Sequence, residues 1–170
     1  MENKKLTVIP ISDVTDEEFA PFGQIVGREK GKGKVDPSFI YWTKNIDLGD
    51  NAEKVDVGLF QVDKTARKVR FFERHLNITE TFMPIEGESI FILGPPDDSN
   101  EKPDISKLKA FYFKEGTGIS LHKGTWHWPP IPMGDRIRLT LFRKGAIGEL
   151  KEVVDIKDVG LDDVTLSFVK

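Results

Sequence analysis

The side chains best suited to chemistry in this sequence are its three histidines, which lie in two short segments. His75 follows Glu73 by two residues and precedes Glu80 by five, whereas His122 and His127 lie in a second segment rich in glycine and tryptophan. Histidine titrates near neutral pH and is the commonest metal ligand in proteins. Imidazoles and carboxylates gathered in this way are typical of acid–base catalysis or of a metal site.

The first segment can bring carboxylates and an imidazole together if it forms a strand. Side chains alternate across a strand, so a strand over residues 69–75 places Glu73 and His75 on one face. A turn over residues 76–79 would return the chain antiparallel and bring Glu80 opposite His75. The alternative is a solvated Glu–His pair at a strand end with Glu80 exposed on a hairpin, because charged side chains usually stay in water.

The second segment predicts a tight turn between two histidines. Gly124 can adopt a positive φ there, and His122 and His127 flank it. Trp126 and Trp128 alternate with His127 and would shield its ring from water. The alternative is that both histidines are hydrogen-bonded structural residues within an aromatic cluster.

Composition narrows the class of protein. The 170 residues suit one domain, spanning residues 1–170, and 38% hydrophobic with 31% charged residues is typical of a globular protein. A net charge of −3 gives no basic surplus for nucleic acid. The absence of cysteine excludes disulfides, thiolate metal ligands and a cysteine nucleophile. No apolar run is long enough for a membrane span, and no secretory leader is evident, so we expect a cytoplasmic protein with no membrane partner.

The elements that must position these side chains are mostly short strands. Segments rich in Val, Ile, Phe and Thr, bounded by turn residues, predict a sandwich or barrel. They are Leu6–Ile11, Val55–Val62, Lys68–Phe72, Ser89–Leu93, Leu108–Phe113, Arg136–Phe142 and Thr165–Val169.

Two short helical turns and several surface segments complete the predicted organisation. Thr15 is a suitable N-cap for a helix, with Glu18 three residues on, and a second turn is expected at Asp104–Lys107. Gly27–Lys34 is interpreted as a mobile loop and Pro95–Pro103 as a surface excursion. The residues from Gly148 onward are expected to add a strand or to mediate association.

The two histidine segments resemble the paired motifs of the cupin superfamily. The first reads Glu73-x-His75-x4-Glu80-x6-Gly87, with glutamate where a histidine is expected; the second reads Gly116-x5-His122-x-Gly124-x2-His127, with His122 in the proline position and Ile131 in the asparagine position. This resemblance implies an all-β double-stranded β-helix, or jelly-roll barrel, with one or two short helices. It also implies a metal on Glu73, His75, Glu80 and His127.

Nearly the whole chain also resembles the ureidoglycolate lyase family. The matching segments are Pro10-Ile11, Phe19–Gly23, Glu73–His75, Thr81–Ile85, Lys102–Phe111, Gly118–His122 and Trp126-His127. Trp128 stands where members can carry another histidine, and Glu80 where some carry glutamine. The resemblance implies cleavage of ureidoglycolate to glyoxylate and urea during allantoin degradation, by a homodimer.

That reaction needs a base, an acid and a cationic anchor for the substrate carboxylate. The expected catalytic residues are His75, Glu80, His122 and His127, with base and acid left unassigned among them. The expected substrate contacts are Arg74, Lys123 and Trp126. A divalent nickel, zinc or manganese ion could serve as a Lewis acid.

Two other classes of function remain open at this point. One is a different cupin enzyme, such as an oxygenase that holds iron on His75, His127 and one carboxylate. The other is a cupin that binds a small molecule without turning it over.

Overall fold

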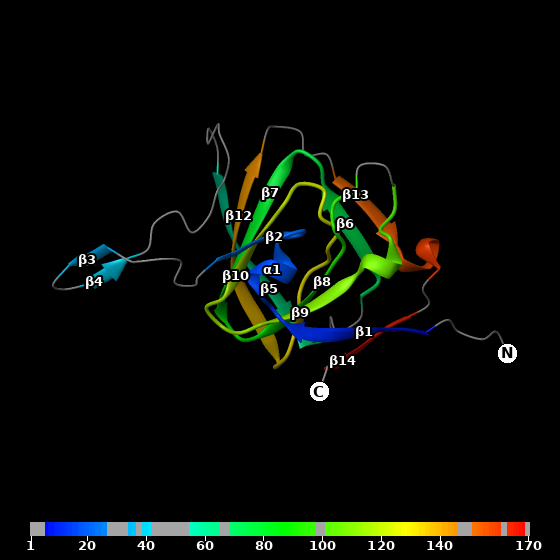
Figure 1. Ribbon diagram of the computed structural model, residues 1–170, viewed down its shortest axis with the longest axis horizontal. Helices are drawn as coiled ribbons and strands as arrows, with labels where there is room; N and C mark the ends of the chain where they lie inside the picture. The colour runs from blue at the N-terminus through cyan, green and yellow to red at the C-terminus, as the bar shows by residue number, and fades with distance from the viewer. Residues whose placement is uncertain are drawn as a thin grey trace.

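The computed structural model describes residues 6–26, 34–36, 39–41, 55–64, 69–97, 101–145, 151–160 and 163–168. Strands dominate these residues, and two five-stranded sheets form the body of the molecule (Figure 1). The all-β jelly-roll class predicted from the sequence is confirmed. None of the helices in the described ranges has the length and apolar character that a membrane crossing requires.

Sheet 1 has the order β11-β8-β9-β1-β14 and contains both antiparallel and parallel pairs. Its strands are β11 (Ile131–Pro132), β8 (Ser89–Leu93), β9 (Lys109–Phe113), β1 (Leu6–Asp13) and β14 (Asp163–Phe168). The parallel pairing of β1 with β14 places strands from the two ends of the chain side by side.

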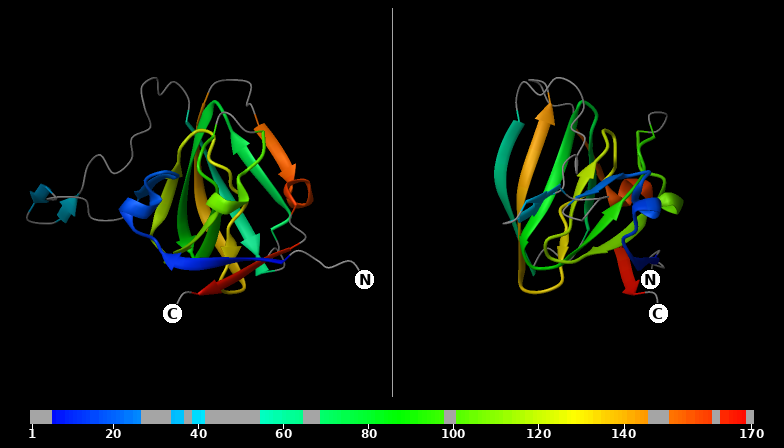
Figure 2. Two further views of the ribbon diagram at one scale, coloured as in Figure 1. Left: turned by 45° about the vertical axis from the view of Figure 1, so that its right-hand side comes forward. Right: turned by 60° about the vertical axis from the view of Figure 1, so that its left-hand side comes forward.

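Sheet 2 has the order β2-β10-β7-β12-β5, and every pair in it is antiparallel. Its strands are β2 (Gly23–Val26), β10 (Gly118–Leu121), β7 (Ile78–Glu86), β12 (Arg136–Gly145) and β5 (Val55–Asp63). Figure 2 shows β5, β12 and β7 standing side by side in its right-hand view.

Smaller elements complete the described fold. A two-stranded sheet pairs β13 (Lys151–Asp155) with β6 (Phe71–His75), and a hairpin pairs β3 (Lys34–Asp36) with β4 (Phe39–Tyr41). The helical segments are α1 (Asp16–Phe19), η2 (Ile105–Lys107) and η3 (Ile156–Val159).

The main core lies between the two sheets and is rich in aromatic rings. Sheet 1 contributes Phe91 and Phe111, and sheet 2 contributes Phe82 and Leu139. Phe19 of α1 packs edge-on against Phe111, with ring centroids 5.4 Å apart. Such edge-to-face pairs add about 0.5–1.5 kcal/mol each beyond the burial of apolar area.

A second core covers the other face of sheet 1. All five residues of β8 are buried, because Phe91 faces the main core while Ile90 and Ile92 face the second. Phe72 of β6 and Ile156 of η3 close this second core from outside. The chain therefore buries β6 on both faces, which is why its polar residues are held in fixed positions.

Most predicted elements are confirmed, with shifted ends. The Thr15 cap accepts a hydrogen bond from the Glu18 amide at 3.2 Å, and the Asp104 turn appears as η2. The strand predicted at Lys68–Phe72 begins later, as β6, and the tail supplies β13 and β14. The Gly27–Lys34 loop lies almost wholly outside the described residues, as does part of Pro95–Pro103.

The turn predicted after His75 brings Glu80 to face His75, as expected, but β6 and β7 are not paired with each other. The intervening turn does bring the two side chains together, but β6 pairs with β13, and β7 pairs with β10 and β12. The turn is therefore a corner between sheets. Sequence alternation predicts which side chains share a face of a strand, but it does not predict which strands pair.

We expect Gly118→Ala to destabilise the fold by about 1–3 kcal/mol, the usual cost of overpacking. A Cβ at Gly118 would press against the Phe82 carbonyl oxygen and the Met83 sulfur, where β10 meets β7. Gly58→Ala is the matched control, since a Cβ there meets nothing within 4 Å. Urea unfolding of both variants measures the difference; equal free energies of unfolding would contradict the expectation.

Candidate active site

Charged and apolar side chains meet around a cavity of about 220 Å³ at one side of sheet 2. This is below the roughly 300–1,000 Å³ of pockets that hold drug-sized ligands, and it suits a small metabolite. Strands β5, β6, β7 and β12 and the segment 127–129 contribute to it. The lining residues are Phe60, Glu73, His75, Glu80, Phe82, His127, Pro129, Leu141 and Arg143.

Main-chain hydrogen bonds hold the two histidine segments together. The Glu73 amide donates to the His127 carbonyl at 2.7 Å, and the His127 amide donates to the Glu73 carbonyl at 2.8 Å. The Gly124 amide donates to the His75 carbonyl at 2.8 Å, and Gly124 has the φ of +80° predicted for its turn. The site geometry is therefore fixed by backbone as well as by side chains.

Glu80 is the centre of the polar contacts. One oxygen, Oε2, lies 3.1 Å from His127 Nε2 and 3.2 Å from His75 Nε2. The other, Oε1, lies 3.4 Å from Arg143 Nε. A buried carboxylate requires such partners, because its desolvation is otherwise costly.

These contacts shift the pKa values of both members of the Glu80–His127 pair. Burial alone would raise the pKa of Glu80, but the hydrogen bonds and charges of His127 and His75 outweigh it and hold that pKa far below its usual range. Burial alone would lower the pKa of His127, but its hydrogen bond to Glu80, the Glu80 charge, the Thr125 carbonyl and the Glu73 charge raise it. The contact therefore shifts both groups toward an ion pair of an ionised Glu80 carboxylate and a protonated His127 imidazole.

The donor set also fits a divalent metal. Glu73, His75 and His127 each offer a ligand atom, and these atoms lie within 4.8 Å of one another. Metal–ligand bonds of about 2.0–2.2 Å place adjacent ligand atoms roughly 3 Å apart. The distances from Glu80 Oε2 to the two imidazole nitrogens match this spacing, so Glu80 could act as a fourth ligand or as a base beside the ion.

His122 does not line this cavity. Its side chain is exposed, and its Nε2 lies 3.2 Å from the Ala20 carbonyl oxygen, linking the turn to the end of α1. It borders only a narrow gap behind His75 and His127. The catalytic role predicted for His122 stays a prediction, and this position favours a structural role.

Arg74 and Trp126 lie on the side of β6 away from the cavity. Arg74 Nε donates to Glu152 at 2.6 Å, its Nη1 donates to the Asp97 carbonyl at 2.9 Å, and its guanidinium stacks 4.6 Å from the Trp126 ring. This buried cluster does not favour the predicted substrate contacts. Trp126 is 1% exposed in the second core, and the ring of His127 instead contacts those of His75 and Phe82.

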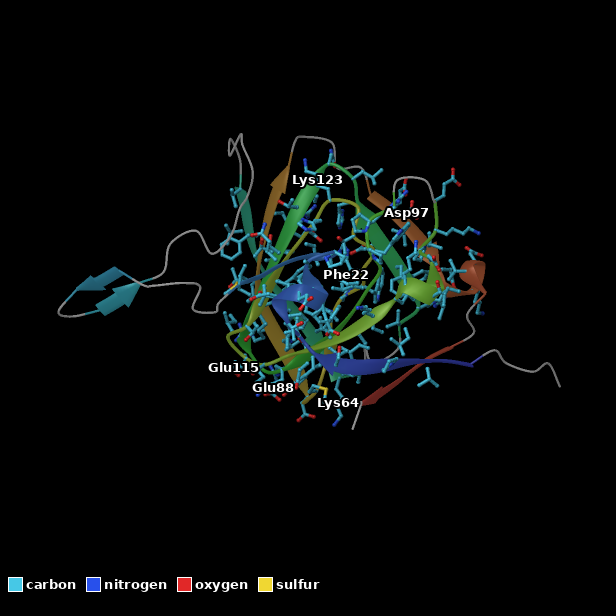
Figure 3. All side chains as sticks on the ribbon, in the orientation of Figure 1. Phe22, Lys64, Glu88, Asp97, Glu115 and Lys123 are labelled. Atoms are coloured by element: carbon cyan, nitrogen blue, oxygen red, sulfur yellow. The ribbon has the colours of Figure 1, made fainter. Side chains whose placement is uncertain are left out.

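The cation that lines the cavity is Arg143, whereas the predicted Lys123 lies outside it. Lys123 is exposed at the turn and lies at one end of the molecule, opposite Glu88 and Glu115 (Figure 3). Arg143 was missed although it lines the cavity. The sequence did contain one indication of its position. Residues at even spacing along a strand share a face, so Arg143 lies on the same inward face of β12 as the buried Ile137 and Leu139.

The fold and site define an all-β protein with a histidine–carboxylate centre that lines a small cavity. A family model described as ureidoglycolate lyase matches residues 6–163. The chain belongs to the ureidoglycolate lyase family, as the sequence resemblance predicted.

Several relatives named ureidoglycolate lyase are similar to most of this chain. Ureidoglycolate lyase of Chelativorans sp. (strain BNC1) is 28% identical over 142 residues, covering 79% of this chain and 84% of the relative. The Schizosaccharomyces pombe enzyme of that name is 24% identical over 166 residues, covering 84% and 85%. The one from Escherichia coli O1:K1 is 27% identical over 131 residues, covering 74% and 78%. A solved structure of Bacillus subtilis oxalate decarboxylase is also similar, at 15% identity and a TM-score of 0.41 over 56% of this chain and 23% of that one.

We expect the Glu80–His127 pair to make the stability of metal-stripped protein depend on pH. The lowered pKa of Glu80 stabilises the fold above its ordinary value of 4.5, and this contribution is lost as the pH falls through the folded pKa. The raised pKa of His127 stabilises it below 6.5, and this contribution is lost as the pH rises through the folded value.

Urea unfolding across this pH range tests the pair. In Glu80→Gln, the free energy of unfolding should depend less on pH in both the acidic and the neutral range. The variant has no carboxylate to protonate at position 80 and no negative charge there to hold the His127 proton. Glu101→Gln, a change at an exposed residue, should keep the wild-type pH dependence. Identical pH profiles for wild type and Glu80→Gln would contradict the assignment.

Proposed function

We propose that this chain is a ureidoglycolate lyase that cleaves ureidoglycolate to glyoxylate and urea. The observation that carries the proposal is the convergence of Glu73, His75, Glu80 and His127 on one small cavity in a chain of this family. The relatives named above carry the same activity in their names over most of the chain length.

The reaction is the reverse of an addition to a carbonyl. The carbinol O–H loses its proton, the O–H electrons become the new C=O bond, and the C–N electrons leave with the urea nitrogen. That nitrogen then takes up one proton, so atoms and charge balance. The protein must accept a proton near the carbinol oxygen and deliver one near the nitrogen.

Glu80 is suited to carry that proton. It is ionised, and it lines the cavity next to both imidazoles, so it can accept the hydroxyl proton. Its lowered pKa makes Glu80 a weak base, so taking the hydroxyl proton requires a positive charge that acidifies the carbinol O–H. Once protonated, Glu80 would readily pass the proton to the departing nitrogen. His127 and His75 orient the carboxylate through contacts with the same oxygen.

A divalent metal would be held by Glu73, His75 and His127. When bound, it would act as a Lewis acid that polarises the carbinol oxygen and lowers the basicity required of Glu80. We propose nickel, zinc or manganese as the candidates, all of which accept imidazole and carboxylate ligands.

The direct test is ureidoglycolate turnover with coupled detection of glyoxylate. The protein is assayed as purified, after metal removal, and after addition of nickel, zinc or manganese. Glyoxylate formation with stoichiometric urea supports the proposal. Oxygen-dependent turnover with bound iron would instead favour an oxygenase on the two-histidine, one-carboxylate set, and ligand-induced stabilisation without turnover would favour a binding protein.

We expect His75→Ala, His127→Ala and Glu80→Gln each to lower kcat about 100-fold or more, the scale of a lost acid–base group. His122→Ala should cost far less, because that side chain is exposed and bonds to the Ala20 carbonyl. Melting temperature and turnover are measured on the same samples. Full activity in well-folded His75→Ala and His127→Ala proteins would rule out this active site.

We also propose a homodimer formed through the outer face of sheet 2. Val57 and Leu59 of β5 are 57% and 60% exposed, and Ile85 of β7 is 54% exposed, so three large apolar side chains of sheet 2 are open to solvent. We expect twice the 19.3 kDa chain mass by light scattering. Leu59→Glu should shift the mass toward the monomer, whereas Val8→Glu, an exposed change on β1, should not. A monomeric wild type at micromolar concentration would contradict the proposal.

A further inference from the structure

We propose that Arg143 binds the substrate carboxylate, so that the site selects small 2-hydroxy acids with an ionised carboxyl group. This inference deepens the proposed function and rests on it, since it concerns the same cavity. Arg143 takes the role of carboxylate anchor that the sequence analysis gave to Arg74 and Lys123, neither of which lines the cavity.

Strand geometry places the Arg143 side chain inside the site. Arg143 pairs directly with Glu80 across β12 and β7, so the two side chains lie on one face. That face also carries Leu139 and Leu141 from β12 and Phe82 from β7, which belong to or pack on the main core. Arg143 continues this apolar row at its solvent-exposed end. The aliphatic part of an arginine side chain can pack along apolar neighbours while its guanidinium group reaches the cavity.

The charges of the cavity require a cation for an anionic ligand. Among the nine lining residues, Glu73 and Glu80 are carboxylates, and Arg143 is the one lysine or arginine. His127 is matched to Glu80 by their contact at 3.1 Å. The two glutamates would repel an entering carboxylate, and a metal bound to Glu73, His75 and His127 would offset part of that negative charge. Arg143 supplies a positive charge that persists at any physiological pH, with or without metal.

Arg143 lines the cavity and is more exposed than the glutamate with which it pairs. Its side chain is 33% exposed, whereas that of Glu80 is 8% exposed, so the arginine lies nearer the solvent side of the pair. A guanidinium has five N–H donors in a planar fork, and the Nε of Arg143 lies 3.4 Å from Glu80 Oε1. Arginine forks bind carboxylates in a bidentate manner.

This anchor also explains how the reacting carbon would be positioned. A carboxylate on Arg143 places the neighbouring 2-hydroxyl within reach of Glu80, because the two side chains are 3.4 Å apart. The remaining walls are apolar, formed by Phe60, Phe82, Pro129 and Leu141. With a volume of about 220 Å³, the cavity favours a short acid over a long one.

The test compares glycolate with glycolamide, which share a skeleton and differ in the charged carboxylate. Binding is measured by calorimetry on the full chain as purified, with metal content matched between variants. Wild type should bind glycolate more tightly. Arg143→Gln should weaken glycolate about 10- to 100-fold and leave glycolamide nearly unchanged, the range expected for a charged hydrogen-bonded pair.

Arg138→Gln is the matched control. Arg138 lies on the same strand with the opposite parity, outside the lining set, and pairs with Glu86 at 3.6 Å. This variant should keep the wild-type preference for glycolate. If Arg143→Gln does not fold because Glu80 loses its partner, Glu80→Gln/Arg143→Gln is compared with Glu80→Gln, and the same loss of preference is expected.

The outcomes separate this inference from the proposed function. An unchanged glycolate preference in the Arg143 variant, or no preference in wild type, would overturn the anchor. A preference that depends on Arg143 in a protein without ureidoglycolate turnover would keep the anchor and reject the lyase. In an active enzyme, Arg143→Gln should raise KM for ureidoglycolate by at least tenfold, and an unchanged KM would overturn the anchor alone.

Discussion

The pair of main-chain hydrogen bonds between Glu73 and His127 is the constraint on which the rest of the site depends. They join two segments far apart in the sequence at 2.7 and 2.8 Å, and the Gly124 amide extends the contact to the His75 carbonyl. Backbone bonds tolerate little movement, since a buried unpaired amide is costly. The imidazole and carboxylate groups therefore approach one another before any ligand arrives.

Burial then strengthens the electrostatic interactions between these neighbouring groups. A carboxylate beside two imidazoles in water would be screened, whereas Glu80 is 7% exposed and His127 is 3% exposed. In such surroundings charges interact strongly, and each group fixes the protonation of the other. The same donors that stabilise the pair can also accept a metal, so charge pairing and metal binding would compete for Glu80 and His127.

The second core explains why this charged site is compatible with a stable fold. The strand β6 presents Glu73 and His75 to the cavity and, on its other face, places Phe72 and Arg74 in buried surroundings. Arg74 is held there by Glu152 from β13, by the Asp97 carbonyl and by the ring of Trp126. The polar residues on the two faces of β6 therefore have different roles. Glu73 and His75 line the cavity, whereas Arg74 supports the strand that carries them.

The sequence by itself determined the site residues that depend on local spacing, and the tertiary structure decided those that depend on strand pairing. Glu73, His75, Glu80 and His127 were recognised from two motifs, because strand alternation and a glycine turn are local properties. Arg74 and Lys123 were the nearest cations in sequence, yet neither lines the cavity. Arg143 lies more than sixty positions beyond Glu80 and meets it through the β12–β7 register. That register is set by which apolar faces bury each other across the whole sheet, a long-range property that no local pattern contains.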